Sequence, residues 1–357
     1  MNWNKNSLTK QLNIKYPIIQ APMASAASVE LAAAVSNAGG LGSLGLSYHK
    51  FEDIFKDYTK LKSQTNRSFN LNFFTHKEPY ENIEKDKKYK SLISKYYKDL
   101  NINKVPEISK TCETFNNKLL DLVLSMNPKV VSFHFGLPGK SVLKKLKEKN
   151  IFIISSATTV EEAKILEKEG ANAIIAQGLE AGGHRGTFAS NYKEGEIGLF
   201  SLLPQIVDAV SVPIIAAGGI ADSRGIVAAI MLGAKAVQLG TAFLKCPEAS
   251  VHPLWANALN KTSAKDTRIT SAFTGRPARG IINKLLIEME NKENLFPDFP
   301  NVGSLIKPLA KEAISKNNTD FTSLWAGQSA PLSKNMSAKE LMNKLIKDTS
   351  DTFNLLK

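Results

Sequence analysis

Residues 171–188 read Ala-Asn-Ala-Ile-Ile-Ala-Gln-Gly-Leu-Glu-Ala-Gly-Gly-His-Arg-Gly-Thr-Phe. A mostly apolar, strand-like run, Ala171–Ile175, leads into a loop in which glycine occupies four of the nine positions from 178 to 186. Glycine lets the backbone approach a flat ligand closely, and His184 in this loop is of the residue type that titrates near physiological pH. The stretch therefore predicts a buried strand that opens into a ligand-binding loop. A flexible surface loop with an incidental histidine is the plainer alternative.

The same alternation of short apolar runs and helix-like segments extends from residue 17 to residue 245. Eight strands are expected at Pro17–Gln20, Gly42–Leu44, Phe69–Phe73, Val130–Phe133, Phe152–Ile154, Ala173–Ala176, Pro213–Ala216 and Ala236–Leu239. The helices expected between them include Val29–Asn37, Ser141–Lys149, Val160–Glu169, Leu202–Val210 and Ser223–Leu232. Continuously apolar strands separated by amphipathic helices are typical of a buried parallel sheet. Eight such units in about 230 residues predict an α/β fold of the (β/α)8 TIM-barrel type, with a doubly wound open sheet as the alternative.

Two segments interrupt this alternation. Residues 75–113, rich in lysine, tyrosine and glutamate, form an insertion after the third strand that is expected to add helices or a partial cover. Residues 250–357 are expected to be mainly helical, around His252–Leu259, Gly280–Glu290, Val302–Lys316 and Ala338–Phe353. The predicted organisation is a cofactor-binding barrel over 1–249 and a helical subdomain over 250–357 packed on the barrel mouth.

Composition argues against a nucleic-acid, membrane or exported protein. The 357 residues are 43% hydrophobic, and no run approaches the roughly 18–20 apolar residues that span a bilayer. Residues 1–10 lack the apolar core of a signal peptide, and Cys112 and Cys246 fit neither a disulfide framework nor a metal cluster, so a cytoplasmic location is expected. The net charge is +13, but 40 of the 46 basic residues are lysines spread among acids. That mixture indicates solvated faces rather than a nucleic-acid surface.

Functional groups of a (β/α)8 barrel collect in the loops after the carboxyl ends of the strands. The seventh and eighth strands are followed by Ala216-Ala-Gly-Gly-Ile220 and Gln238-Leu-Gly-Thr241. The exposed N–H groups of such loops, with the dipoles of the following helices, bind phosphate without a dedicated cation. These residues predict a phosphate site, with two tight turns as the alternative.

The other strand ends carry groups suited to a flat cofactor. Ala21-Pro22-Met23 would present backbone to a planar ring, and the amides of Asn72 and Gln177 could hydrogen-bond the polar edge of a flavin. With the phosphate site they favour FMN over a dinucleotide, because no Gly-x-Gly-x-x-Gly opens a helix in a βαβ unit. A second histidine, His134, follows the fourth strand between two phenylalanines. The histidine spacing and the lack of a Gly-x-Ser-x-Gly sequence argue against metal and serine-hydrolase chemistry.

Four motifs, in this order, resemble those of the class I nitronate monooxygenases, formerly called 2-nitropropane dioxygenases. They are Gln20-Ala-Pro-Met-Ala24, Ser132-Phe-His-Phe-Gly-Leu-Pro138, Ser155-Ser-Ala-Thr-Thr159 and residues 176–186, and the resemblance extends from Tyr16 to Trp325-Ala-Gly-Gln328. It implies a TIM barrel with an added helical domain, which holds FMN without a covalent bond and needs no metal.

The resemblance also implies roles for single residues. Ala21, Pro22 and Met23 would line the flavin ring, which Asn72, Gln177 and Gly182 would contact. The phosphate side of FMN would be held by Gly218, Gly219, Gln238, Gly240 and Thr241. His184 matches the active-site histidine of the family, and His134 matches a second pocket histidine. Arg185 could contact the phosphate, the substrate or an acid such as Glu180, and a loop-fixing salt bridge is the simplest expectation.

The implied reaction is the oxidation of alkyl nitronates, such as propionate 3-nitronate, by O2 to a carbonyl compound and nitrite, through one-electron transfer and a flavin semiquinone. Protonated His184 and His134 are expected to bind the anionic substrate, and His184 would be the base where a neutral nitroalkane is accepted. A lysine or tyrosine of the helical tail would meet the substrate carboxylate. No nucleic acid or membrane is an expected partner, and the protein is expected to be a monomer or a homodimer.

The flavin-dependent enoyl-acyl-carrier-protein reductases are the alternative. They use NAD(P)H and share the FMN barrel and a loop very similar to Glu180-Ala-Gly-Gly-His184. The segment Phe133-His-Phe-Gly-Leu-Pro138 favours the monooxygenase, because the reductases have a glycine-rich segment without histidine at that place.

Overall fold

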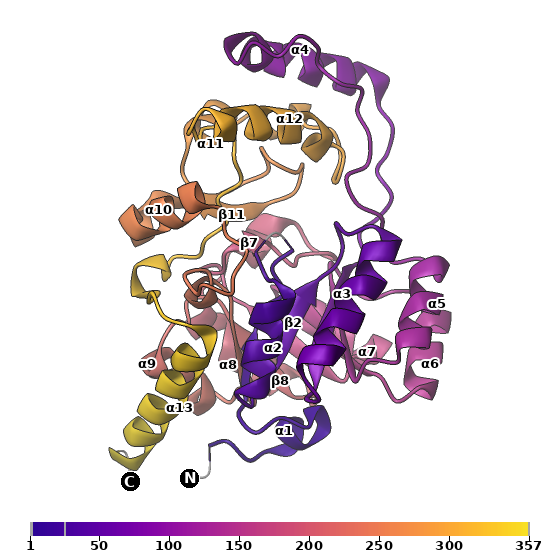
Figure 1. The fold of residues 1–357 in the computed structure, drawn as a ribbon. Coiled ribbons are helices and arrows are strands. Elements are labelled where there is room, and N and C mark those ends of the chain that lie inside the picture. The colour runs from indigo at the N-terminus through magenta and orange to yellow at the C-terminus, as the bar shows by residue number, and fades with distance from the viewer. Residues whose placement is uncertain (1–2, 25, 356–357) are drawn as a thin grey trace.

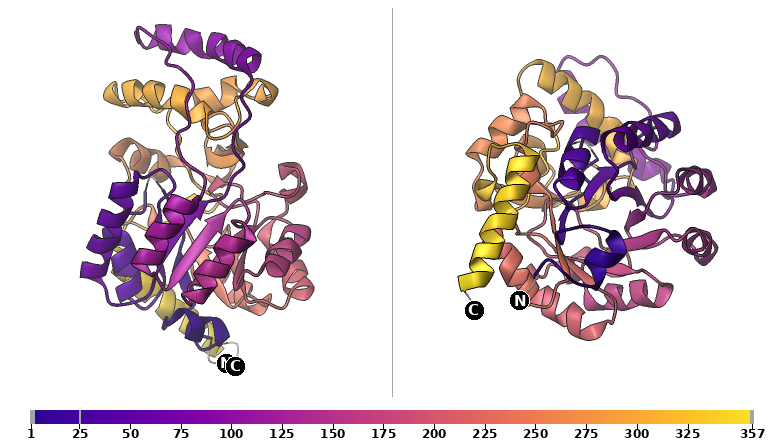
Figure 2. Two further views of the ribbon diagram at one scale, coloured as in Figure 1. Left: turned by 90° about the vertical axis from the view of Figure 1, so that its right-hand side faces the viewer. Right: turned by 60° about the horizontal axis from the view of Figure 1, so that its bottom comes forward.

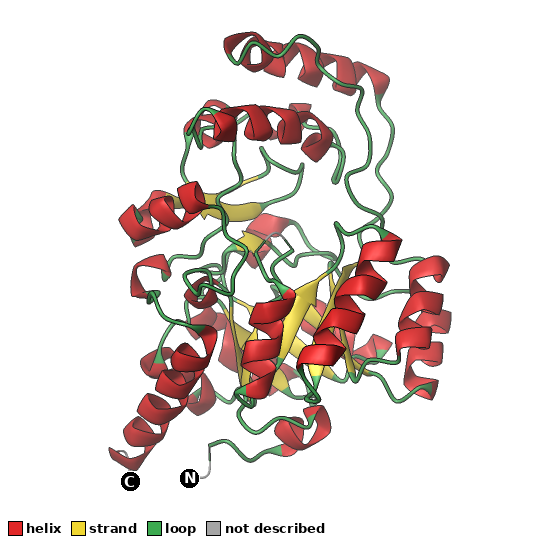
Figure 3. Cartoon of the chain, in the orientation of Figure 1, coloured by secondary structure: helices red, strands yellow, loops and turns green. Residues whose placement is uncertain are grey.

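Eight parallel strands form the barrel expected from the sequence. In the computed structural model, which describes residues 3–24 and 26–355, the strands follow the order β1-β9-β8-β6-β5-β4-β3-β2. Leu41, just before β2, exchanges backbone hydrogen bonds of 3.0 and 2.9 Å with Ile18 and Gln20 and brings the two edges together. Figure 3 shows these strands at the centre of the ring of helices. The strands are β1 (Ile18–Gln20), β2 (Gly42–Gly45), β3 (Phe69–Phe74), β4 (Val130–His134), β5 (Phe152–Ala157), β6 (Ala173–Gln177), β8 (Ile214–Ala217) and β9 (Ala236–Leu239).

The strands are apolar on both faces because both faces are covered. In β6, Ile175 packs with the residues that fill the barrel, whereas its neighbour Ile174 packs with the surrounding helices. Leu8 and Leu12 of α1 (Ser7–Leu12) belong to the interior cluster and cover the amino-terminal end of the barrel. This two-sided burial is why the strand-forming runs lack the polar alternation of a one-sided sheet.

Helices surround the barrel, and the eighth position is filled from far along the chain. The helices that follow successive strands are α2 (Val29–Asn37), α3 (Phe51–Gln64), α5 (Asn117–Met126), α6 (Lys140–Glu148), α7 (Val160–Glu169), α8 (Leu199–Ala209) and α9 (Ser223–Met231). After β9 comes only a 3-10 turn, η2 (Thr241–Phe243), and α13 (Ala338–Leu355) packs against both α2 and α9 (Figure 1). The end of the segment predicted as a mouth subdomain therefore lies on the side of the barrel. The division of the chain at residue 250 stays a prediction.

The insertion and the middle of the tail form a cap over the carboxyl ends of the strands. The cap contains α10 (Pro253–Lys261), α11 (Lys284–Glu288), α12 (Val302–Ser315) and, from the insertion, α4 (Ile83–Asp99). Figures 1 and 2 show α4 lying across α12, on the side away from the barrel. Tyr89, Ile93 and Tyr97 of α4 pack with Leu305 and Leu309 of α12, and the Tyr97 hydroxyl donates to the Leu305 carbonyl (2.7 Å). Within the described ranges, no helix is long and apolar enough to span a membrane.

Part of the tail predicted as helix is a small antiparallel sheet. Strand β11 (Ala278–Ile281) pairs with β10 (Thr267–Thr270) on one side and with β7 (Gly183–His184) on the other. The helix expected over Gly280–Glu290 is therefore wrong in its first part, and α11 begins after Asn283, whose side chain caps the N–H of Leu286 (3.2 Å). The strand at 278–281 forms because its partner comes from the glycine-rich loop, about a hundred residues earlier in the chain, and no local pattern encodes that pairing.

Candidate active site

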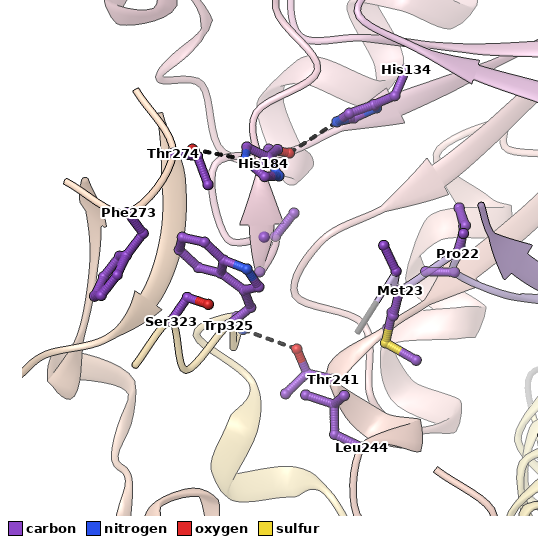
Figure 4. A pocket seen from close by; sticks show the side chains of 18 of the residues that line it. Pro22, Met23, His134, His184, Thr241, Leu244, Phe273, Thr274, Ser323 and Trp325 are labelled. Carbon is purple, nitrogen blue, oxygen red and sulfur yellow. Dashed lines mark hydrogen bonds between the residues drawn. The ribbon is translucent and has the colours of Figure 1, made fainter. Parts of the chain in front are cut away.

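A cavity of about 410 Å³ lies between the carboxyl ends of the strands and the cap. Residues from eight barrel loops and from the cap line it, and Figure 4 shows part of that lining. The structure brings together in this cavity all thirteen residues singled out from the sequence: Ala21, Pro22, Met23, Asn72, His134, Gln177, Gly182, His184, Gly218, Gly219, Gln238, Gly240 and Thr241. The cofactor and catalytic roles given to them remain predictions.

The turns after β1 and β9 form one wall. The N–H of Ala21 donates to the Leu239 carbonyl (2.8 Å), which ties the start of the first turn to the last strand. A Cβ placed on Gly240 would lie 3.4 Å from Ala21 Cβ and 3.8 Å from Met23 Sδ. The two turns thus lie side by side and together form one wall of the cavity.

Glycine backbone after β8 and β9 forms a cradle of N–H donors. Gly218 and Gly219 have φ of +107° and +72°, a conformation that disfavours any side chain. Within residues 3–24 and 26–355, the N–H groups of Gly219, Gly240 and Thr241 find no acceptor. Free N–H groups in such turns suit a phosphate.

A segment of the tail, Ala326–Ser333, lies across these loops; we call it the strap. The Gly327 N–H donates to Thr241 Oγ1 (2.9 Å) and the Ser329 hydroxyl to the Gly219 carbonyl (2.5 Å). The Gln328 N–H donates to the Glu180 carbonyl (3.0 Å). The strap therefore joins the loops after β6, β8 and β9. The Trp325-Ala-Gly-Gln328 motif marked this segment in the sequence without showing what it touches.

The amides of Asn72 and Gln177 differ in what they leave free. Asn72 Nδ2 donates to the hydroxyl and carbonyl of Ser132 (2.9 and 3.2 Å), and its Oδ1 has no partner among the described residues. Gln177 bridges the loop instead: its Nε2 donates to the His184 carbonyl (2.9 Å), and its Oε1 accepts from the Gly186 N–H (2.8 Å). Asn72 can accept a hydrogen bond from a ligand, whereas Gln177 holds the His184 loop.

Arg185 fixes the same loop without a carboxylate. Its buried guanidinium donates to three carbonyls, those of Gln177 (3.1 Å), Gly178 (2.6 Å) and Gly195 (2.8 Å). The salt bridge expected for it is therefore wrong, because the Glu180 carboxylate instead accepts from the Leu199 N–H (2.9 and 3.0 Å) at the start of α8. A buried cation can be satisfied by carbonyl dipoles when several converge on it.

His184 projects from β7 into the cavity between aromatic rings. Its Nε2 lies 3.0 Å from Thr274 Oγ1 (Figure 4), and its Nδ1 has no partner in the described chain. The rings of four residues lie within 5.6–6.0 Å of the imidazole, centroid to centroid: Phe74, Phe135, Phe299 and Trp325.

His134 supports the backbone of His184. Its Nε2 lies 3.1 Å from the His184 carbonyl, and its Nδ1 lies 3.0 Å from Ser156 Oγ. Because that carbonyl is only an acceptor, Nε2 carries a proton and Nδ1 accepts from the serine hydroxyl in the neutral ring. The two histidines named from the sequence are thus connected through the backbone of one of them.

Both imidazoles are neutral at neutral pH. Burial lowers the pKa of His184 to about 3, and the charges of His134, Arg276 and His76 act in the same direction. Burial lowers the pKa of His134 to about 4, although its bond to the His184 carbonyl opposes the shift. These pKa directions argue against the expectation that a protonated histidine pair binds the anionic substrate, since the surrounding rings and cations disfavour a further positive charge.

Two other side chains supply the positive charge near the cavity. The Arg276 guanidinium stacks on Phe135, 3.8 Å from the ring centroid, and donates to the Thr187 carbonyl. Burial lowers its pKa to about 10, so it stays charged. Lys307 of α12 lines the cavity with its Nζ 5.5 Å from the centroid of the Tyr48 ring, and no carboxylate of the described ranges pairs with it. Sequence reasoning missed Lys307 because it is one of 40 lysines, and only the cap places it here.

Known proteins match this chain over nearly its whole length. A family model described as "Nitronate monooxygenase" matches residues 5–348. A probable nitronate monooxygenase of Staphylococcus saprophyticus subsp. saprophyticus is 40% identical over 349 residues, which are 97% of this chain and 98% of that protein. A probable nitronate monooxygenase of Staphylococcus aureus is 39% identical over 345 residues, 96% and 97% of the two chains.

Solved structures also match this chain over nearly its whole length. A nitroalkane oxidase from Streptomyces ansochromogenes has a TM-score of 0.88 at 34% identity, with 99% of this chain and 100% of that one covered. FabK from Thermotoga maritima has a TM-score of 0.76 at 29% identity, with 99% and 98% covered. The enoyl reductase domain of MlnA from Bacillus amyloliquefaciens shares the fold, with a TM-score of 0.66 at 12% identity over 98% of each chain.

Proposed function

The chain belongs to the nitronate monooxygenase family, a family of flavin-dependent oxidoreductases, and from that membership we propose that it binds FMN at the barrel mouth and oxidises alkyl nitronates with O2 to a carbonyl compound and nitrite. The observation that carries the proposal is the cavity: the glycine cradle, a free amide oxygen and a histidine in an aromatic enclosure face one space. The residues of these three features were singled out in different parts of the sequence.

FMN fits this cavity by the chemistry of its lining. The N–H groups of Gly219, Gly240 and Thr241 would hold the phosphate, and Asn72 Oδ1 would accept from the N–H of the flavin pyrimidine ring. The wall at Ala21–Met23 would support the ring system. When bound, FMN supplies the one-electron redox chemistry that connects a nitronate to O2.

The substrate would lie beside His184, enclosed by aromatic rings that exclude water. Arg276 would contribute a permanent positive charge near the anion, and a neutral His184 would contribute a hydrogen-bonding nitrogen. A nitronate already carries the carbanion charge, so its oxidation needs no base. A neutral nitroalkane needs one, and His184 is the group placed for it.

Propionate 3-nitronate is the substrate we propose among nitronates. Its carboxylate would face Lys307, which lines the cavity from the cap and lacks an acidic partner in the described chain. This assigns the tail residue that the sequence left unnamed.

The first experiment tests cofactor and reaction together. The purified protein is expected to be yellow, to release FMN on denaturation, and to lose its visible absorbance when mixed anaerobically with propionate 3-nitronate. Admission of air should then yield nitrite. A colourless protein that does not bind added FMN would contradict the proposal, and bleaching by NADH but not by the nitronate would support the enoyl reductase instead.

The enoyl reductase gains no support of its own from the site. The histidine at the end of β4 that separates the two families in sequence lines the cavity as His134. Family match and relatives also favour the monooxygenase.

A further inference from the structure

We infer that Thr274 is a positioning residue that fixes the tautomer of His184, so that Nε2 carries the ring proton and Nδ1 faces the cavity as a proton acceptor. The inference rests on the proposed function and deepens it, because it makes neutral nitroalkanes substrates that the protein itself converts to nitronates.

The hydrogen bonds around the Thr274 hydroxyl set its direction. Oγ1 lies 3.2 Å from the Arg276 carbonyl, 3.0 Å from His184 Nε2 and 3.3 Å from the Arg276 N–H. A hydroxyl has one proton to donate. The Arg276 carbonyl can only accept, and no other donor of the described chain reaches it. We assign the hydroxyl proton to that carbonyl, which leaves Nε2 to donate to Oγ1.

Backbone pairing holds the two residues at this distance. Ala278 of β11 is in register with His184 of β7, and the Arg185 N–H donates to the Pro277 carbonyl (2.9 Å). Thr274 lies in the turn that connects β10 to β11. The imidazole is thus carried by one strand of the small sheet, and the hydroxyl by the turn that connects its other two strands.

The surroundings keep the ring in its neutral form, which has a single N–H. The charged and titratable groups that face His184 are His134 at the end of β4, Arg276 in the β10–β11 turn and His76 in the loop after β3. All three oppose a positive charge on the ring. With one ring proton, held at Nε2 by Thr274, the lone pair is at Nδ1, which is unpartnered and not enclosed by protein.

The resulting step is a proton transfer. Nδ1 takes the α-proton of a nitroalkane, and the C–H electron pair becomes part of the C=N bond of the nitronate. The ring becomes an imidazolium whose Nε2–H is still bound by Thr274. A substrate supplied as the nitronate bypasses this step.

The test compares two substrates in variants of the FMN-loaded protein. Thr274→Val keeps the shape of the side chain and removes the hydroxyl, whereas Thr274→Ser keeps the hydroxyl. We expect Thr274→Val to lower kcat for nitroethane by ~10- to 100-fold, to change kcat for ethyl nitronate by less than about threefold, and Thr274→Ser to restore nitroethane turnover. Equal losses on both substrates, or no loss on either, would overturn the inference.

Nitrogen NMR of the histidine side chains gives a readout that does not depend on turnover or on a variant at Thr274. With ¹⁵N-labelled histidine, the His184 signals are identified by their loss in His184→Asn. The wild-type protein should show the proton on Nε2, and a proton on Nδ1 would overturn the inference. If the wild type oxidises neither ethyl nitronate nor nitroethane, the proposed function fails, and the NMR result still decides the tautomer.

Discussion

Gln177 shows how a single side chain can organise an active-site loop. Its two ends bind the His184 carbonyl and the buried Gly186 N–H. Gln177→Leu leaves that N–H without an acceptor, which we expect to lower the free energy of unfolding by about 1–3 kcal/mol. Displacement of His184 should also reduce nitrite formation by ~10- to 100-fold.

Thermal unfolding and nitrite release check this prediction, with the exposed Gln205→Leu of α8 as the matched control. If Gln177→Leu behaves like that control, Gln177 does not hold the loop.

Lys307 is the residue at which substrate charge can be tested. It lines the cavity but is itself exposed to solvent, so the gain from pairing with a carboxylate is modest. We expect Lys307→Met to raise KM for propionate 3-nitronate by about two- to fivefold and to leave KM for ethyl nitronate, which has no carboxylate, unchanged. Lys311→Met, exposed on the same helix, should alter neither. An equal rise for both substrates would show that Lys307 does not recognise the carboxylate.

Much of the site was predictable from single residues because strand ends converge. Once eight strands are recognised, the residues at and just after their carboxyl ends must meet at one end of the barrel, and so Ala21, Asn72 and Gly218 share a cavity although they are far apart in sequence. Thr274 and Lys307 come from the cap, which no strand rule positions. The neutral state of the histidines also lay beyond sequence reasoning, because it depends on burial and on Arg276, which packing alone places.

At the scale of elements, the strap, Ala326–Ser333, has no room for an added side chain at Gly327. A Cβ on Gly327 would lie 2.6 Å from the Glu180 carbonyl oxygen and 2.9 Å from the Gly182 nitrogen. Gly327→Ala should push the strap away from the phosphate cradle. FMN binding should then be weaker by about tenfold if the shift costs the hydrogen bond from the Gly327 N–H to Thr241 Oγ1.

Titration of the FMN-free protein with FMN, followed by flavin fluorescence, measures this change. Gly139→Ala at the start of α6 is the control, because a Cβ there meets nothing within 4 Å. Equal FMN affinity in the two variants would mean that the strap takes no part in cofactor binding.

The elements also differ in how well the local sequence predicts them. The eight barrel strands are continuous apolar runs, and their burial on both faces leaves a strong local signal. Strands β10 and β11 have none, because Thr-Arg-Ile-Thr and Ala-Arg-Gly-Ile are half polar and form only by pairing with each other and with β7. The start of α8 at Leu199, three residues earlier than expected, has a similar cause, since the Glu180 carboxylate caps the Leu199 N–H from another loop.

For the whole molecule, the neutral histidines predict a pH-dependent stability. Burial lowers the pKa of His76 and of His134 to about 4 and that of His184 to about 3, whereas the unfolded chain protonates histidine at about pH 6.5. Between these values the unfolded state binds more protons, so stability is full above pH 6.5 and falls as the pH drops through that window. The melting temperature should therefore decrease from pH 7 to pH 5.

His134→Gln should flatten this decrease, and His252→Gln, at an exposed position, should not. Melting curves of the three proteins at several pH values decide the matter. A wild-type melting temperature that is constant over this range would contradict the neutral state of the buried rings.

The position of α13 has a consequence for how the protein is made. This helix completes the ring of helices by packing against α2, and Trp3 stacks with Phe353 at 6.3 Å and donates to the Ser350 hydroxyl (3.1 Å). During synthesis α2 is made long before α13, so the face of α2 that α13 covers has no partner until α13 has been made. The ring of helices is therefore complete only after α13 has been synthesised.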